Sequence, residues 1–205
     1  MSKSKISKGK LVRKFGENIF GNPKFDNLLN KKPYTPGQHG PTRRKRLSNY
    51  GLQLKEKQKT KAMYGVLEKQ FRNYFHKAEK MDGETGLNLL KLLEKRLDNV
   101  VYRLGFASTR SQARQLVSHC HFLLNNKKCN YPSASLEPGD VIRVRDKSKK
   151  MDIILSSIKR IKGDIDLPWL ELDKANMSGT FIAVPDREEM QVVVNEQLIV
   201  ELYSK

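Results

Sequence analysis

Residues 93–147 read LEKRLDNVVYRLGFASTRSQARQLVSHCHFLLNNKKCNYPSASLEPGDVIRVRDK, and this stretch decides the fold. Apolar residues recur every three or four positions up to Leu104, and Gly105 follows as a C-terminal cap, so the pattern predicts a helix. Thr109 and Gln112 have the spacing of a capping box, which predicts the start of a second helix. The apolar residues of that helix are expected to face inward: Ala113, Leu116 and Val117.

Strands are expected after the two helices. Cys120–Leu124 and Lys127–Asn130 flank the pair Asn125-Asn126, and asparagine tolerates the positive φ of a two-residue hairpin turn. Further on, Val141–Arg145 alternates apolar and basic residues, which predicts a strand with one apolar and one basic face. The stretch therefore predicts two helices, a hairpin and a strand, with basic residues gathered on one side.

Four of those basic or aromatic positions are candidate contacts to a polyanion. Arg110 and Arg114 are four residues apart and are expected to share the outward face of the second helix, where a solvated surface is the alternative interpretation. His119 and His121 are expected on one strand face, where they reach phosphate, stack on a base or remain ordinary surface histidines.

Helical patterns flank this stretch on both sides. Ser48 is a suitable N-cap for a helix, Gly65 marks a break between two helices, and Tyr50 belongs to the expected apolar stripe. Residues 151–190 predict strand and loop, with the only tryptophan as a core anchor, and residues 195–205 predict a short terminal helix. Residues 1–47 contain four prolines and little apolar periodicity, so they are expected to order only against RNA, with a solvated flexible arm as the alternative.

Charge favours a nucleic-acid partner. The 205 residues carry 40 Lys and Arg against 22 Asp and Glu, a formal net charge of +18. The excess lies in the first 150 residues, since residues 151–205 have a net charge of −4 and are expected to face protein or water. Lysine outnumbers arginine 27 to 13, which suits phosphate neutralisation more than the reading of bases.

Several other classes of protein are not expected. The chain has no run of 18 apolar residues and so no expected membrane span, and its two cysteines favour a reducing cytoplasm. The Lys-rich start is less typical of an organelle transit peptide. His119, Cys120, His121 and Cys129 lie close in sequence, but on a strand Cys120 would point away from both histidines, so no metal or other cofactor is expected. Asp98 has no partner for acid–base catalysis and is expected to orient Arg96 and Arg103.

The chain also resembles a known family in six collinear stretches. They lie at residues 36–40, 56–59, 64–68, 96–101, 113–119 and 196–205 and read PGQHG, EKQK, YGVLE, RLDNVV, ARQLVSH and EQLIVELYSK. Together they resemble bacterial small-subunit ribosomal protein four, from about residue 10 to the end. The family's usual Arg-Tyr-x-Gly-Pro opening is absent from Met1 to Lys10, its Asn-Gly hairpin turn is Asn-Asn here, and no cysteine before Cys120 could form the N-terminal zinc site of some members.

The resemblance implies an α+β fold in three parts: a basic N-terminal extension (1–47), a helical domain (48–92) closed by the C-terminal helix (195–205), and an inserted mixed domain (93–190) with helices packed on an antiparallel sheet. The inserted domain contains an RNA-binding unit (93–150). The resemblance implies a structural, cytoplasmic ribosomal protein without a small-molecule substrate. It also implies three partners: small-subunit ribosomal RNA, bound early in assembly; small-subunit protein five, in an interface that influences accuracy; and mRNA near the channel by which it enters the subunit.

The residues carried over from the family form two groups. The mRNA side would be Arg43, Arg44, Lys45 and Arg46, and the ribosomal RNA face would include Lys55, Lys59, Arg72, Arg96, Arg110, Arg114, His119, His121 and Arg143. An RNA-modifying enzyme is the competing interpretation, since pseudouridine synthases carry a similar small domain, but residues 1–92 and 151–205 offer no catalytic constellation. A stress factor that binds free subunits is a third interpretation, against which the helical domain and terminal helix argue.

Overall fold

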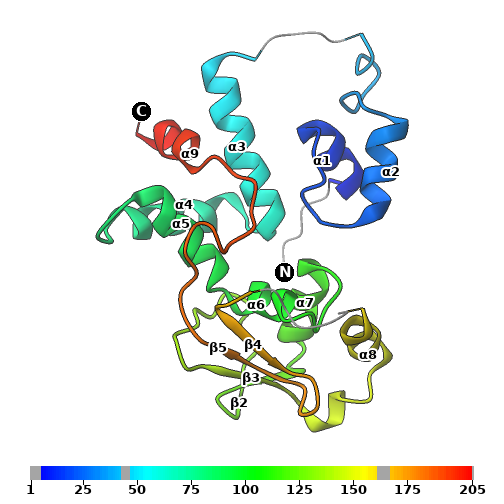
Figure 1. The fold of residues 1–205 in the computed structure, drawn as a ribbon. Helices are drawn as coiled ribbons and strands as arrows, with labels where there is room; N and C mark the ends of the chain where they lie inside the picture. Colours follow the sequence, from blue (N-terminus) through cyan, green and yellow to red (C-terminus); the bar gives the residue numbers. More distant parts are fainter. Residues whose placement is uncertain (1–5, 43–46, 161–166, 205) are drawn as a thin grey trace. The chain divides into compact units, whose positions relative to one another are not determined.

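The computed structural model describes residues 6–42, 47–160 and 167–204 (Figure 1). The chain forms two compact units, Met1–Phe75 with Val193–Lys205 and His76–Val192. The first unit is helical, and the second combines helices with an antiparallel sheet, which confirms the α+β class. The domain boundaries predicted from the sequence, between residues 47 and 48 and between residues 92 and 93, stay predictions.

Three helices of the first unit follow the predicted pattern. Helix α3 (Asn49–Tyr64) begins where the Ser48 side chain accepts a hydrogen bond from the Gly51 backbone N–H. It ends at Gly65, whose φ of 64° lies in the left-handed region that glycine adopts without strain. Helix α4 (Glu68–Glu79) follows, and helix α9 (Glu196–Tyr203) starts at the Asn195 cap.

Helix α9 packs on this unit, as predicted. Its Ile199 is fully buried, and Tyr203 stacks on Phe75 with 4.4 Å between ring centres. Gln53 of α3 donates a hydrogen bond of 2.8 Å to Glu201 of α9. Helix α9, from the end of the sequence, therefore packs with α3 and α4 in one helical cluster. Tyr50 does not belong to it, because its side chain is 58% exposed, so its place in the apolar stripe was predicted wrongly.

The N-terminal segment contains two helices that the sequence analysis did not predict. They are α1 (Lys8–Phe15) and α2 (Pro23–Lys31). Val12, Phe15 and Ile19 are spaced three and four residues apart and are buried. Three apolar side chains at helical spacing give this segment an interior despite its charge. The expectation of little apolar periodicity is therefore wrong for these residues, while ordering only against RNA stays a prediction and Arg43–Arg46 lie outside the described residues.

The second unit is built on a five-stranded antiparallel sheet in the order β2-β1-β3-β5-β4. Its strands are β1 (Phe122–Leu124), β2 (Lys127–Lys128), β3 (Val141–Val144), β4 (Leu170–Asp173) and β5 (Ser178–Phe181). Asn125 and Asn126 both have positive φ, 49° and 64°, as the predicted hairpin turn requires. On β3, Ile142 and Val144 are fully buried, so the predicted alternation is confirmed.

Helices α6 (Leu97–Arg103), α7 (Arg110–Ser118) and α8 (Asp152–Lys159) pack on this sheet (Figure 1). Helix α5 (Thr85–Glu94) precedes them and contacts α6, and a 3₁₀ turn at Asp146–Ser148 comes before α8. The core between them contains Trp169, which is 1% exposed as the predicted anchor. Helix α8 corrects the prediction of strand and loop after residue 151. Ile154 and Ser157 are buried and the partly buried Ile158 packs against the core, so the inward positions recur at three and four residues, whereas in a strand Ile154 and Ser157 would lie on opposite faces.

Candidate nucleic-acid interface

The start of helix α7 fixes the phase of its two arginines. Thr109 accepts a hydrogen bond of 3.2 Å from the Gln112 backbone N–H, so the predicted N-cap is confirmed. The return bond differs from the predicted capping box, because the Gln112 side chain accepts from the N–H and the hydroxyl of Ser108, at 2.8 and 2.7 Å. Because Thr109 is the N-cap, the helix begins at Arg110, and Arg114 lies one turn later on the same face.

Arg110 and Arg114 lie against helix α6 and are half-buried. The Arg110 Nε donates a hydrogen bond of 2.8 Å to the Asn99 Oδ1, and its guanidinium lies 4.6 Å from the ring centre of Tyr102. The Arg114 guanidinium lies 3.8 Å from the Asp98 carboxylate, and its side chain is 25% exposed. The prediction of a simple outward face was therefore incomplete, because residues of α6 hold these side chains in place while leaving them partly accessible.

Two buried carboxylates provide this support. Asp98 forms a two-point pair with Arg96, through bonds of 3.0 and 2.8 Å. Glu94 is fully buried and accepts from Asn99 at 2.6 Å and from Arg103 at 2.8 Å. The prediction that Asp98 orients Arg96 is confirmed. Arg103, however, pairs with Glu94, which lies nine residues earlier at the end of the preceding helix.

The network separates inner from outer cations. Arg96 is 1% exposed, so its charge is compensated inside the unit by Asp98. Arg114 also contacts Asp98 but its side chain is 25% exposed, and Arg110, which bonds to the Asn99 amide oxygen, is half-buried, so both keep part of their charge at the surface. A surface of this kind attracts phosphate while its side chains lose little conformational freedom on binding.

His119 and His121 come together, but not on a strand. His119 caps the end of α7, Cys120 has a left-handed φ of 58°, and β1 begins only at Phe122. The predicted strand from Cys120 is therefore wrong, because the helix end needs a residue with positive φ at this point. The two imidazole rings nevertheless lie 6.2 Å apart.

The environment of His121 favours its neutral form. Its Nδ1 lies 2.9 Å from the Ser148 hydroxyl. Burial lowers the pKa of His121 below its usual 6.5, and the nearby charges of His119 and Arg145 lower it further. Arg145 donates to the Cys120 carbonyl oxygen at 3.2 Å and so holds the turn between the histidines. A neutral ring at this position suits stacking or hydrogen bonding more than ion pairing.

Arg143 adds to the basic side of the sheet. Its side chain is 43% exposed, as the alternation of β3 predicts, and it lies 4.0 Å from the Asp146 carboxylate. Lys149 pairs with the same carboxylate at 2.9 Å, and its hydrogen bond and charge lower the pKa of Asp146. Asp146 is thus an acid shared by two cations, and the local balance remains positive.

The remaining predicted contacts lie in the first unit, where they differ in accessibility. Lys55 is half-buried on α3, and Arg72 is exposed on α4. Lys59 is only 3% exposed, and its ammonium pairs with Glu17 at 3.0 Å and Glu56 at 3.1 Å. Lys59 therefore connects α3 to the N-terminal segment and has no accessible charge to offer a polyanion. The predicted Arg43–Arg46 lie outside the described residues.

The sequence analysis missed two supporting residues. They are Glu94 and Tyr102, neither of which was predicted to contribute to the site. Glu94 of α5 accepts hydrogen bonds from α6, and Tyr102 of α6 contacts Arg110 of α7. The only local signal for them was that Asn99 and Arg103 lie off the apolar stripe of their helix.

Among residues 6–42, 47–160 and 167–204, no three His, Cys, Asp or Glu side chains converge as a metal site. No helix in those ranges is both long and apolar enough to cross a bilayer.

Comparisons with known proteins agree with this arrangement. Residues 3–94 match the ribosomal protein S4/S9 N-terminal domain, and residues 95–142 match the S4 domain. The chain is 50% identical over 205 residues, all of both chains, to the small ribosomal subunit protein uS4 of Chlorobaculum tepidum. It is 54% identical over 196 residues, 96% of each chain, to the protein of that name from Parabacteroides distasonis. The one from Porphyromonas gingivalis is 52% identical over 198 residues, 97% of this chain and 96% of the relative.

Proposed function

Because the chain belongs to the uS4 family of small ribosomal subunit proteins, we propose that it binds small-subunit ribosomal RNA directly and helps to nucleate assembly of the subunit. Members of this family are structural proteins of the ribosome with an S4 RNA-binding domain and are not enzymes. The cytoplasmic ribosome is accordingly its place of action. The observation that carries the proposal is the pair Arg110 and Arg114, held at the start of α7 by Asn99 and Asp98.

The proposed ribosomal RNA contacts are the accessible members of the predicted set. In the second unit the proposed face comprises Arg110, Arg114, His119, His121 and Arg143. In the first unit, taken by itself, the proposed contacts are Lys55 and Arg72. Lys59 and Arg96 are not among the contacts, since acids already compensate their charges. Affinity comes mainly from lysine and arginine neutralising phosphates, and the shape of the folded RNA supplies specificity.

Two further partners belong to the proposal. The net charge of −4 over residues 151–205 supports contact with a protein neighbour, small-subunit protein five, at an interface that contributes to translational accuracy. The cluster Arg43–Arg46 supports contact with mRNA where it enters the subunit. Both assignments rest on charge and on family membership.

The test is the salt dependence of RNA binding. We compare the full-length protein with the double variant Arg110→Ala/Arg114→Ala on a small-subunit ribosomal RNA fragment. Loss of two phosphate contacts should weaken binding and make the slope of log affinity against log salt shallower by about one to two units. Circular dichroism checks folding, because Arg110 also bonds to Asn99.

A matched control removes the same charge elsewhere in the second unit. Lys80 and Lys174 are both exposed and lie outside the proposed face. The variant Lys80→Ala/Lys174→Ala should change affinity and salt slope less than the arginine double variant. Equal effects of the two double variants would mean that only net charge matters, and an unchanged slope in the arginine variant would reject this face.

A further inference from the structure

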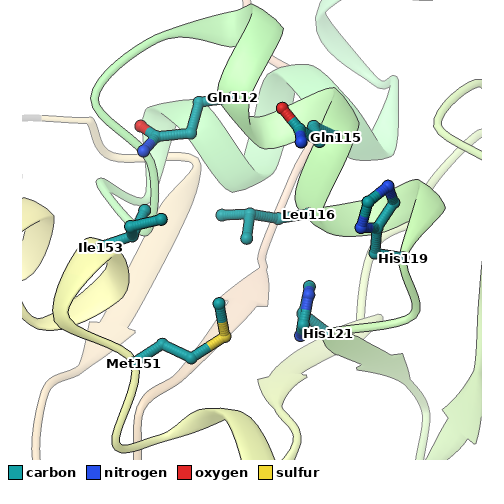
Figure 2. A pocket seen from close by; sticks show the side chains of 7 residues that line it. All are labelled: Gln112, Gln115, Leu116, His119, His121, Met151 and Ile153. Carbon is teal, nitrogen blue, oxygen red and sulfur yellow. The ribbon is translucent and has the colours of Figure 1, made fainter.

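A hollow of about 160 Å³ lies beside helix α7, next to the segment that leads into α8 (Figure 2). Its apolar wall consists of Leu116, Met151 and Ile153, and its polar rim of Gln112, Gln115, His119 and His121. Leu116 is 5% exposed, whereas Ile153 is 44% exposed, so apolar surface is open to solvent here. Apolar cavities of about 150 Å³ accept one aromatic ring.

The hollow is not confined to the S4 domain. Helix α7 lies inside residues 95–142, which match that domain, but Met151 and Ile153 follow it. The 3₁₀ turn at Asp146–Ser148 brings this later segment against the histidines, since the Ser148 hydroxyl contacts His121. The site therefore depends on the longer chain of this protein and not on the shared domain alone.

The polar rim has defined hydrogen-bonding groups. The Gln112 carbonyl oxygen is occupied by Ser108, and Figure 2 shows its amide nitrogen turned towards Ile153. Gln115 is exposed and offers one acceptor and two donors. A glutamine amide of this kind forms paired hydrogen bonds with a base edge. The imidazoles of His119 and His121 add flat surfaces on the other side of the hollow.

Charge at the edge of the hollow selects the kind of ligand. Residues 145–150 read RDKSKK and carry four cations against the single acid Asp146. Lys147 and Lys150 in this segment are exposed, and Met151 of the hollow follows directly. Basic proteins and peptides are repelled from such an edge, whereas the phosphates of RNA are attracted to it.

We propose that the hollow receives one unpaired nucleobase of the bound RNA, with the adjoining phosphate on the segment 145–150. The base ring lies on Leu116, Met151 and Ile153, and the Gln115 amide bonds to its edge. Unstacked bases in RNA are recognised in this way, by flat or apolar surfaces together with polar groups at the edge. The inference rests on the proposed RNA-binding function and adds to it a contact that distinguishes unpaired from paired RNA.

The experiment uses two RNA hairpins and the full-length protein. One hairpin carries a single bulged 2-aminopurine, and the other has the same stem with that base paired. The wild-type protein should bind the bulged hairpin about fivefold or more tightly, as stacking of one base implies. The fluorescence of the bulged 2-aminopurine should change on binding, and that of the paired base should not.

Two variants separate the hollow from general RNA binding. Gln115→Ala/Ile153→Ser removes an exposed amide and exposed apolar surface, so the fold should persist, and it should reduce the preference for the bulged hairpin to about onefold. The control Ser111→Ala, on the same helix outside the hollow, should keep the preference. Equal binding of both hairpins by the wild type, or an unchanged preference in the double variant, would reject the nucleobase site. In either case, RNA affinity that falls steeply with salt concentration would leave the proposed function standing. If the protein bound neither hairpin, both proposals would be rejected.

Discussion

At the scale of single residues, buried groups decide what the exposed ones can do. Arg110 and Arg114 reach the surface in a fixed orientation because Asn99 and Asp98 hold them from inside. Lys59 shows the opposite outcome, since its ammonium pairs with Glu17 and Glu56 and its side chain is only 3% exposed. A basic residue is thus a contact to RNA only where its acid partners leave it accessible.

Gly179 is a residue where packing permits no side chain. A Cβ atom added there would lie 2.6 Å from both methyl carbons of Leu104, which is itself fully buried. We expect Gly179→Ala to lower the free energy of unfolding by about 1–3 kcal/mol, because neither β5 nor α6 can move away without disturbing the core. Urea unfolding followed by the fluorescence of Trp169, in the same unit, measures this.

A double-mutant cycle provides the control for Gly179. Leu104→Ala alone creates a cavity and should cost about 2–5 kcal/mol. In that background Gly179→Ala should cost little, because the clashing methyl groups are gone. Additive costs of the two substitutions would contradict the proposed clash and place the effect elsewhere in the sheet.

His121 should make stability sensitive to mild acid. Burial first, and then the charges of His119 and Arg145, lower its pKa in the folded protein below 6.5. As pH falls through and below 6.5 the unfolded chain takes up the proton before the folded one, so stability present at higher pH is lost. Urea unfolding at pH 7.5 and pH 5.5 should therefore show a smaller loss for His121→Gln than for the wild type. Ser111→Ala, at an exposed residue that does not titrate, is the control and should lose as much stability as the wild type.

At the scale of elements, a shared acid ties three helices of the first unit together. Glu68 of α4 accepts from Lys57 at 2.6 Å and from Lys61 at 2.7 Å, both on α3, and from the Tyr203 hydroxyl of α9 at 3.3 Å. Burial opposes ionisation of Glu68, but the two lysines overcome it and lower its pKa to about 2. The acid therefore fixes which faces of α3, α4 and α9 meet.

The ionisation of Tyr203 at alkaline pH tests the contact between α9 and Glu68 of α4. Burial and then the Glu68 carboxylate raise the pKa of Tyr203 to about 12. Between the usual 10 and about 12 the unfolded chain loses the phenolic proton and the folded one keeps it, so stability is lost as pH rises. Subtracting the absorbance titration of Tyr203→Phe from that of the wild type should isolate one phenol with a pKa of about 12. A difference curve centred near 10 would mean that Tyr203 lies in solvent instead.

At the scale of the whole molecule, the chain's two termini contribute to the same unit, while Arg110 and Arg114 of the proposed RNA face lie in the other. Charge follows a different division, since the first 150 residues hold the excess of cations and residues 151–205 are net negative. A deletion at the C-terminus therefore separates folding of the helical unit from RNA contact in the S4 domain.

Deleting Asn195–Lys205 removes the fully buried Ile199 and the ring stacked on Phe75. Burial of one such aliphatic side chain contributes about 1.5–3 kcal/mol. We expect the midpoint of helix unfolding to fall by several degrees, RNA affinity to change little, and stop-codon readthrough to change in ribosomes that carry the truncated protein. The matched variant Val193→Ala, at a residue that is 77% exposed just before the deletion, should leave all three unchanged. Collapse of RNA affinity with normal readthrough would make the tail an RNA element and contradict the proposed protein contact.

The sequence by itself determined the elements whose signals are local. The Thr109 cap, the Asn125-Asn126 turn, the alternation of β3 and the Asn195 cap all act within a few residues, so pattern and backbone preference suffice to predict them. It also favoured a nucleic-acid partner, since net charge is a property of composition, and the six stretches that resemble the family implied RNA. Local signals failed where they were weak or ambiguous, as in α1, α2 and α8.

Only the tertiary structure decided which basic residues remain accessible. Arg96 and Arg114 look alike in sequence, yet Asp98 holds Arg96 inside the unit and leaves Arg114 at the surface. The hollow beside α7 likewise combines Gln115 with Ile153, which are 38 positions apart. Burial and ion pairing depend on contacts between residues far apart in the chain, and helical or strand periodicity contains no information about them.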